Sequence, residues 1–135
     1  MYNKVTEDEI NEKRRLICAE FDMPDPGSDP IAMKLTDADL DDAARSGAML
    51  DRLVEKYKLN GLAYYYEGKP GTLSQKVAST LIVGNSILNA QGIPMCGEFD
   101  IKTCIAMLIM DRLDIGGSFA EFHPFDFDED FILVG

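Results

Sequence analysis

The side chain with the clearest chemical potential in this sequence is Glu98, in the segment Gly97-Glu98-Phe99-Asp100. The segment follows the short apolar run 93–96 and opens a helical pattern, so we expect it to join a strand to a helix. Ligand sites in α/β folds gather beyond the carboxyl ends of strands. Gly97 would allow a close approach of the backbone, and the Glu98 carboxylate would lie near helix N-terminal amides. The alternative is a helix start that carries ordinary N-terminal acids.

A second candidate is the pair of Glu121 and His123 in the stretch 116–123. Strand alternation would place both side chains on one face, together with Phe119. A carboxylate and an imidazole two residues apart on a strand can bind a hard or borderline cation. The alternative is a strand face that is exposed to solvent and holds no ligand.

A third group of acids, Asp126, Asp128 and Asp130, has the spacing that begins a calcium-binding loop. The glycine and the distal glutamate of such a loop are missing, so we favour a solvated acidic turn with its phenylalanines pointing inward. The sequence also lacks a glycine-rich phosphate loop and a Gly-x-Ser-x-Gly elbow. Its only histidine is His123, so a serine or cysteine triad would have to use that residue.

Hydrophobic periodicity predicts the elements that must position these side chains. Thr6 with Glu9 forms a capping-box pattern, and Thr36 with Asp39 marks a second helix start. Breaker residues interrupt the chain at 23–30, and the tyrosines at 64–66 are expected to pack in the core and across strands. In chain order we expect helix 7–22, helix 36–57, strand 62–66, helix 72–91, strand 93–96, helix 100–113 and a β-rich tail.

The order strand, helix, strand, helix predicts a parallel sheet with covering helices, hence an α/β fold with a partial Rossmann-like layered domain. We expect this central domain over residues 1–115, truncated at its N-terminal side. The first β residues of a following β-rich domain would occupy 116–135. The hydrophobic stretch 131–135 at the end of the chain favours a cut from a longer protein, and the alternative is a terminal strand docked into a sheet.

Charge and cysteine content oppose some classes of function and indicate the cellular compartment. The 24 acidic residues outnumber the 13 basic ones and give a net charge of -11, which opposes binding to nucleic acid or an anionic membrane. Cys18, Cys96 and Cys104 match no zinc or redox spacing, so we expect free, mostly buried thiols in a reducing compartment. The N-terminus lacks a signal-peptide core, and the longest apolar run, 104–110, is far shorter than the roughly 20 residues of a spanning helix. These features predict a cytoplasmic protein.

A longer pattern runs from Gly92 to Gly135: GIPMCGEFDIKTCIAMLIMDRLDIGGSFAEFHPFDFDEDFILVG. It contains Gly-Ile-Pro, a Gly-Glu-x-Asp-x-Lys-Thr helix start, a Gly-Gly-Ser-Phe that leads to a glutamate, and an acidic turn before a Val-Gly strand. This pattern resembles the L-arabinose isomerase family, within the L-fucose/L-arabinose isomerase superfamily. Residues 36–91 match the family more loosely, and residues 1–35 contribute little.

The resemblance implies interconversion of an aldose and a ketose sugar with a divalent cation, typically manganese, which two glutamates and two histidines ligate. Glu98 and Glu121 fall on the two glutamates, which in this family also act as acid–base groups. His123 falls on neither histidine position, and both ligand histidines are expected outside these 135 residues. The resemblance therefore implies a fragment, inactive in isolation, of an enzyme that forms homo-oligomers.

Two other hypotheses assign the chain a function other than sugar isomerisation. The first is a stand-alone acidic interaction module, in which the helix start 37–42 and exposed aromatic residues contact a protein partner. The second is a non-catalytic cation-binding protein that uses Asp126, Asp128 and Asp130.

Overall fold

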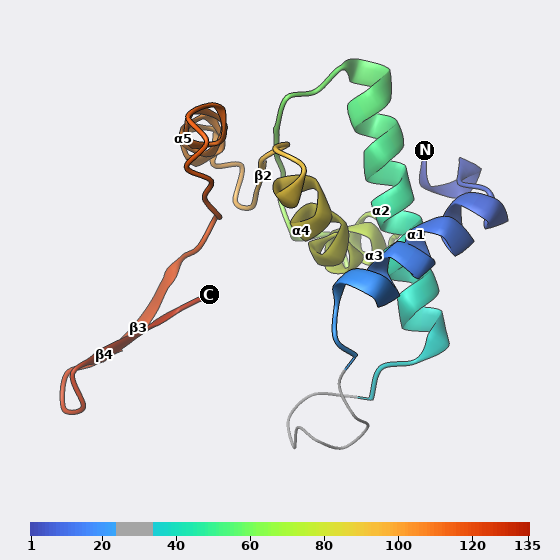
Figure 1. Ribbon diagram of the computed structural model, residues 1–135. Helices are drawn as coiled ribbons and strands as arrows, with labels where there is room; N and C mark the ends of the chain where they lie inside the picture. The colour runs from blue at the N-terminus through green and yellow to red at the C-terminus, as the bar shows by residue number, and fades with distance from the viewer. Residues whose placement is uncertain (24–33) are drawn as a thin grey trace.

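The computed structural model describes residues 1–23 and 34–135, and most of its core lies in a layer of helices. The breaker segment expected at 23–30 lies outside the described residues except for Met23. Helices α1, α3 and α4 all pack against the long helix α2, and Figure 1 shows them gathered on one side of the molecule together with the N-terminus. The helical elements of this layer are η1 (Tyr2–Lys4), α1 (Glu7–Glu20), α2 (Asp37–Tyr57), α3 (Leu73–Thr80) and α4 (Ile82–Ala90).

Both predicted helix starts are capping boxes in the structure. The Glu9 N–H donates to the Thr6 hydroxyl (3.4 Å), and the Thr6 N–H donates to the Glu9 carboxylate (2.7 Å). Thr36 and Asp39 make the same reciprocal pair at the start of α2, with distances of 2.9 and 3.2 Å. Each box satisfies backbone donors that the first helical turn leaves free. Helices α1 and α2 therefore begin where the sequence predicts.

Two glycines let α2 and α4 approach closely enough to form the main core. A Cβ added to Gly84 would lie 2.8 Å from the Gly47 Cα atom, so a side chain at position 84 would push the helices apart. Buried apolar residues surround this crossing in two clusters, one shared by α1, α2 and α4 and the other by α2, α4 and the second strand. Their largest fully buried side chains are Ile10, Ile17, Leu50 and Leu88.

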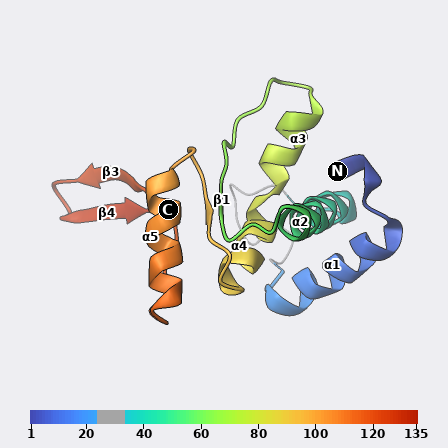
Figure 2. The ribbon, with the colours of Figure 1, turned by 90° about the horizontal axis from the view of Figure 1, so that it is seen from above.

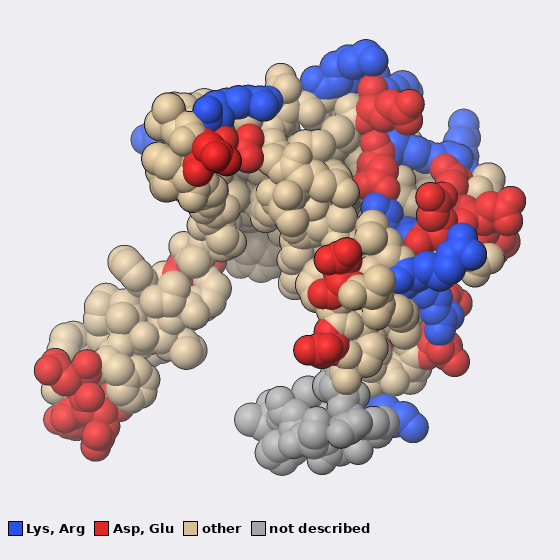
Figure 3. All heavy atoms as spheres, in the orientation of Figure 1, with Lys and Arg blue, Asp and Glu red and all other residues tan. Residues whose placement is uncertain are grey.

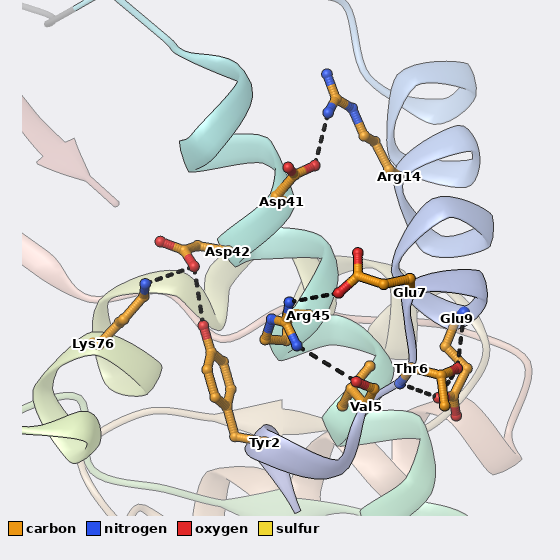
Figure 4. Close-up of polar contacts among 10 residues, drawn as sticks. All are labelled: Tyr2, Val5, Thr6, Glu7, Glu9, Arg14, Asp41, Asp42, Arg45 and Lys76. Atoms are coloured by element: carbon orange, nitrogen blue, oxygen red, sulfur yellow. Dashed lines mark hydrogen bonds and ion pairs between the residues drawn. The ribbon is translucent and has the colours of Figure 1, made fainter.

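Polar contacts fasten the N-terminal segment to α2 and α3 (Figure 4). The Tyr2 hydroxyl donates to the Asp42 carboxylate (3.1 Å), which also pairs with Lys76 of α3 (2.7 Å). Arg14 of α1 pairs with Asp41 (2.7 Å). Burial and the negative charge of Asp42 raise the pKa of Tyr2, so its hydroxyl stays a donor in this contact.

Two short strands, β1 (Leu62–Ala63) and β2 (Met95–Cys96), pair in parallel, and α3 and α4 form the connection between them. The ladder is shorter than the predicted strands, although the hydrogen bonds continue beyond it: the Tyr64 N–H donates to the Cys96 carbonyl (2.9 Å). The protein is thus a mixed helical and β structure with a small parallel sheet. In the described part of the chain, no helix is both long and apolar enough to cross a membrane.

The prediction of a single helix over 72–91 is wrong in one respect, because the structure divides this segment at Leu81 into α3 and α4. The Thr80 hydroxyl is bonded to the Lys76 carbonyl one turn earlier (2.9 Å) and to the Ser46 hydroxyl of α2 (2.6 Å). A threonine that bonds back to the preceding turn bends a helix, which accounts for the interruption.

The remaining elements are α5 (Ile101–Arg112) and the antiparallel hairpin of β3 (Phe122–Asp126) and β4 (Phe131–Val134). One face of α5 joins a small buried cluster of Cys96, Cys104 and Met107. The opposite face exposes apolar side chains at Ile101, Ile105 and Ile109. In Figures 1 and 2 the hairpin extends away from the helical layer. Figure 3 shows it as a largely uncharged arm with acidic residues at its tip.

Glu9 connects the α1 cap to Arg52 of α2, and this predicts how the protein responds to acid. Hydrogen bonds from Thr6, and then from the Arg52 guanidinium, lower the pKa of Glu9 from 4.5 to about 2. A carboxyl whose pKa is lower in the folded state stabilises the fold fully above pH 4.5 and loses this effect as the pH falls through 2. We expect Glu9→Gln to flatten the pH dependence of the free energy of unfolding in that window, measured by urea titration with circular dichroism.

The control for this prediction is Glu12→Gln, because Glu12 is exposed on the same helix. This variant should keep the pH dependence of the original protein. An equal flattening in both variants would contradict a specific role for Glu9.

Candidate functional site

The carboxyl ends of β1 and β2 bring two segments of the chain side by side. Beyond β1 the chain continues as 64–66, and beyond β2 it continues as 97–99. The Tyr64 N–H donates to the Cys96 carbonyl (2.9 Å), and the Phe99 N–H donates to the Tyr64 carbonyl (3.0 Å). These bonds hold Glu98 beside Tyr65 and Tyr66, at the sheet edge where the sequence predicts a site.

The backbone of Glu98 and Phe99 lies in the left-handed region, with φ of 58° and 55°. A side chain in this region costs roughly 1 kcal/mol per residue, and such strain gathers at functional sites. The turn is closed by a hydrogen bond from the Asp100 N–H to the Gly97 carbonyl (3.0 Å). The helix-start role belongs to Asp100, whose carboxylate accepts the Thr103 N–H (2.9 Å). Glu98 is therefore not needed as the cap of α5, and the strain needs another explanation.

Glu98 lies close enough to Tyr66 to change its acidity. Hydrogen bonding to the Glu98 carboxylate, together with its negative charge, raises the pKa of Tyr66 to about 12. The neighbouring Tyr65 hydroxyl donates to the Glu67 carboxylate (3.3 Å), and the charge of Glu67 raises the pKa of Tyr65 as well. The Tyr65 hydroxyl thus donates to a carboxylate, and the raised pKa values keep both hydroxyls protonated at neutral pH.

Tyr65 and Tyr66 are the neighbours of Glu98 that the sequence did not predict. Core packing was expected for all three tyrosines, and it describes only Tyr64, which is half-buried and accepts a hydrogen bond from the Asn85 Nδ2 atom (2.6 Å). Tyr65 and Tyr66 are 41% and 49% exposed. Successive side chains of an extended segment alternate in direction, so at least one of the three tyrosines has to point outward. Strand alternation in the sequence was therefore the signal against core packing for all three.

Glu121 is connected to this site through Phe119. The Phe119 ring packs over Gly97, where an added Cβ would lie 3.4 Å from the ring atom Cε1, and it contacts the buried cluster under α5. Glu121 follows two residues later with an exposed side chain, and its backbone pairs in both directions with Gly135 (2.7 and 3.1 Å). The structure thus brings the segment that carries Glu121 against the residue that precedes Glu98.

The alternation predicted for 119–123 does not continue regularly into β3. Phe122 pairs with Val134 and Phe125 pairs with Ile132, so β3 holds one more residue than β4 between these two pairs. His123 lies in this bulge, and a Cβ added to Gly135 would lie 3.0 Å from its Nε2 atom. A bulge redirects the side chains of its strand, so regular alternation does not determine the direction of His123.

The acidic turn of the hairpin forms as predicted, but the orientation of its phenylalanines was predicted wrongly. The Asp126 carboxylate accepts hydrogen bonds from the N–H groups of Asp128 and Glu129 (both 3.0 Å). Phe125 and Phe127 stack on each other and are 58% and 87% exposed. They point outward because, within residues 1–23 and 34–135, no second layer covers the hairpin.

The cysteines are free thiols, as the sequence predicts, with Cys96 and Cys104 buried and Cys18 exposed. Burial raises the pKa of Cys96 to about 12. A thiol of this kind is protonated at neutral pH and is a poor nucleophile and metal ligand. The chemistry of the site therefore belongs to its carboxylates.

Glu98 and Glu121 offer oxygen donors of the kind that hard divalent cations prefer. Both side chains are exposed. Among the described residues there is no group of three or more His, Cys, Asp or Glu side chains that could hold a metal ion. The donor chemistry thus fits a divalent cation, and two carboxylates are only part of a ligand set.

Comparison with known proteins adds no relative to this picture. No family model, no curated protein and no solved structure matches the chain. The assignment of Glu98 and Glu121 therefore depends on the resemblance of residues 92–135 and on the geometry described above.

The left-handed backbone of Glu98 predicts a conflict between stability and function at this position. Glycine adopts a φ of 58° without the steric cost of a Cβ atom. We expect Glu98→Gly to raise the free energy of unfolding by about 0.5–1 kcal/mol, measured by urea unfolding.

The matched control is Glu67→Gly, because it removes the same side chain from a residue whose φ is not positive. This variant should lower the free energy of unfolding by roughly 0.5 kcal/mol through the added freedom of the unfolded chain. Equal losses of stability in the two variants would contradict the strained backbone.

Proposed function

We propose that this chain is part of a cytoplasmic, divalent-metal-dependent sugar isomerase that interconverts an aldose and a ketose through an enediol. One observation supports the proposal most: the strained residue Glu98 lies at the carboxyl ends of two parallel strands, where α/β folds bind ligands. The proposal includes the finer fold, a Rossmann-like layered domain over 1–115 and the start of a β-rich domain over 116–135. Its partners are a sugar substrate and, in the full-length enzyme, other copies of the chain.

The proposed reaction needs two groups that exchange protons with adjacent carbon and oxygen atoms of the sugar. One of Glu98 and Glu121 removes the proton from carbon, and the other takes up the proton of the neighbouring hydroxyl. The proton taken from C2 is delivered to C1, and the proton taken from the C2 hydroxyl is delivered to the C1 oxygen as the C2 carbonyl forms, so both glutamates end the cycle as they began it. A divalent cation such as manganese, held by these carboxylates, would stabilise the negative charge that develops on the sugar oxygens.

The exposed apolar surfaces of α5 and the hairpin support a larger enzyme around these residues. Ile105 and Ile109 on α5 are 53% and 55% exposed, and Phe122 on β3 is 76% exposed. Large apolar side chains exposed on a helix face and on a hairpin favour an interface, and an isolated two-stranded hairpin is marginally stable in water. The protein that covers these faces is also where we expect the two histidine ligands.

The alternative of a stand-alone acidic interaction module receives less support. Asp37 and Asp41 at the start of α2 pair with Arg14, and Asp42 pairs with Lys76. Much of the acidic face that would contact a partner is therefore neutralised within the chain. The third hypothesis, a cation site in the acidic turn, competes directly with the glutamate site.

Manganese binding distinguishes the glutamate site from the acidic turn. We expect Mn²⁺ to bind the 135-residue chain weakly, with a dissociation constant on the order of 1 mM, because only two carboxylates contribute. Paramagnetic broadening of the amide NMR signals should affect Glu98 and Glu121 together, and Glu98→Gln should reduce it at both positions. Broadening confined to 126–130 would support the acidic turn and contradict the proposal.

Glu67→Gln is the matched control for this titration. It removes a carboxylate close to the tyrosines but outside the proposed ligand pair, so broadening at Glu98 and Glu121 should persist. An equal loss of broadening in both variants would mean that Mn²⁺ is attracted only by the overall negative charge of the surface.

The isolated chain is expected to be inactive as an isomerase, because it holds only two of the four ligands that the resemblance implies. Ketose formation from an aldopentose in the presence of Mn²⁺ should not exceed the rate without protein. In the full-length enzyme, Glu98→Gln should lower kcat by at least about 100-fold while the melting temperature stays unchanged. Wild-type turnover in that variant would refute Glu98 as an acid–base group.

A further inference from the structure

We propose that Tyr65 is a positioning residue for Glu98: its ring stacks on Phe99 and so holds the Glu98–Phe99 turn in its left-handed conformation. The inference rests on the proposed function of Glu98. It adds a residue that neither the sequence pattern nor the resemblance assigns. Tyr65 acts through the backbone of its neighbour and touches neither the sugar nor the cation.

Two consecutive left-handed residues need a restraint from outside their own turn. At positive φ the Cβ atom of an L-residue crowds the backbone, so Glu98 and Phe99 would relax to negative φ if the turn were free. The bonds within the turn run from the Asp100 N–H to the Gly97 carbonyl (3.0 Å) and from the Ile101 N–H to the Phe99 carbonyl (2.8 Å). These donors lie at the start of α5, in its cap residue and first helical residue, where solvent can replace a local acceptor.

The restraint from outside comes from the segment after β1. The Tyr64 carbonyl accepts the Phe99 N–H (3.0 Å). The Tyr65 ring stacks on the Phe99 ring with a centroid distance of 5.2 Å and an interplanar angle of 15°. Tyr65 is itself supported by the Tyr66 ring, at a centroid distance of 5.2 Å.

The stack matters for Glu98 because the direction of a side chain follows the backbone that carries it. If φ relaxed, the Glu98 carboxylate would move away from Tyr66 and from the end of β2. Proton transfer depends on a carboxylate held in place, so this movement would remove Glu98 from the reaction. The rings of Tyr65 and Phe99 are 41% and 63% exposed, so the main contribution of their contact is local conformation rather than core stability.

The test compares two substitutions at position 65 in the 135-residue chain. Tyr65→Ala removes the ring, whereas Tyr65→Phe keeps the ring and removes only the hydroxyl. Three-bond couplings between the amide and α protons of Glu98 and Phe99 report φ, and hydrogen exchange of the Phe99 amide reports its bond to Tyr64. In Tyr65→Ala we expect the couplings to shift toward values for negative φ and the Phe99 amide to exchange about tenfold faster. Tyr65→Phe should retain the original values.

Tyr57→Ala is the matched control, since it removes another exposed tyrosine ring, at the end of α2. The Glu98 and Phe99 signals should not change in this variant. Unchanged couplings in Tyr65→Ala would overturn the proposal. Changes of equal size in Tyr57→Ala would overturn it too, because they would report a general loss of stability.

A double variant tests the connection to the strained backbone directly. Glycine at position 98 needs no restraint at positive φ, so Tyr65→Ala should accelerate exchange of the Phe99 amide less in a Glu98→Gly background than in the original chain. An equal acceleration in both backgrounds would contradict the proposed link between the ring and the conformation of Glu98.

Failure of the proposed function gives a different result from failure of this inference. Couplings and exchange rates require no activity, so they test the positioning alone. If Glu98→Gln leaves turnover of the full-length enzyme intact while Tyr65→Ala still releases the turn, the isomerase proposal fails and the conformational role of Tyr65 stands.

Discussion

A two-residue parallel ladder, β1 against β2, connects the helical layer to α5 and holds side by side the segments that follow each strand. A parallel pair cannot be closed by a tight turn, so the chain crosses over through α3 and α4 before it returns. The approach is close at Gly61, where an added Cβ would lie 3.0 Å from the Cys104 Sγ atom and 3.2 Å from the Pro94 carbonyl oxygen. Without this pairing, Glu98 would have no tyrosines beside it, because they precede it by more than thirty residues.

The two sides of the ladder are supported very differently. On the helical side, the contact between Gly47 and Gly84, two capping boxes and a set of ion pairs hold α1, α2 and α4 around a buried core. On the other side, α5 buries one face through Cys104 and Met107, and the hairpin exposes nearly all of its side chains. Stability of this kind is not uniform, and the candidate site lies where the well-packed side meets the poorly packed one.

Acidic residues near helix starts have two distinct uses in this protein. Asp39 completes the capping box of α2 and Asp100 caps α5, and hydrogen bonds from Thr36 and Thr103 lower the pKa of each carboxyl. Glu98 precedes a helix as well, but the capping position is already taken by Asp100. Its carboxylate caps no helix, and this contrast separates a candidate functional acid from structural ones that look similar in sequence.

Much of the local structure could be predicted from the sequence, because its causes lie within a few residues. The capping boxes at Thr6 and Thr36, the helical character of α1, α2 and α5, and the acidic turn closed by Asp126 all depend on neighbours close in the chain. Glu98 and Glu121 were also named as candidates from sequence, through residue type, position and a family resemblance. Their role as a metal and acid–base pair stays a prediction.

Which of these local features come into contact with one another is determined only by the tertiary structure. The hydroxyl contact between Thr80, at the break of the helix, and Ser46 of α2 joins segments that are distant in sequence, and the outward phenylalanines of the hairpin reflect the lack of a covering layer over it in the described chain. The left-handed turn at Glu98 and the stack of Tyr65 on Phe99 depend on the β1–β2 register. Sequence periodicity describes the faces of single elements, whereas a register between distant strands is determined by the packing of the whole chain.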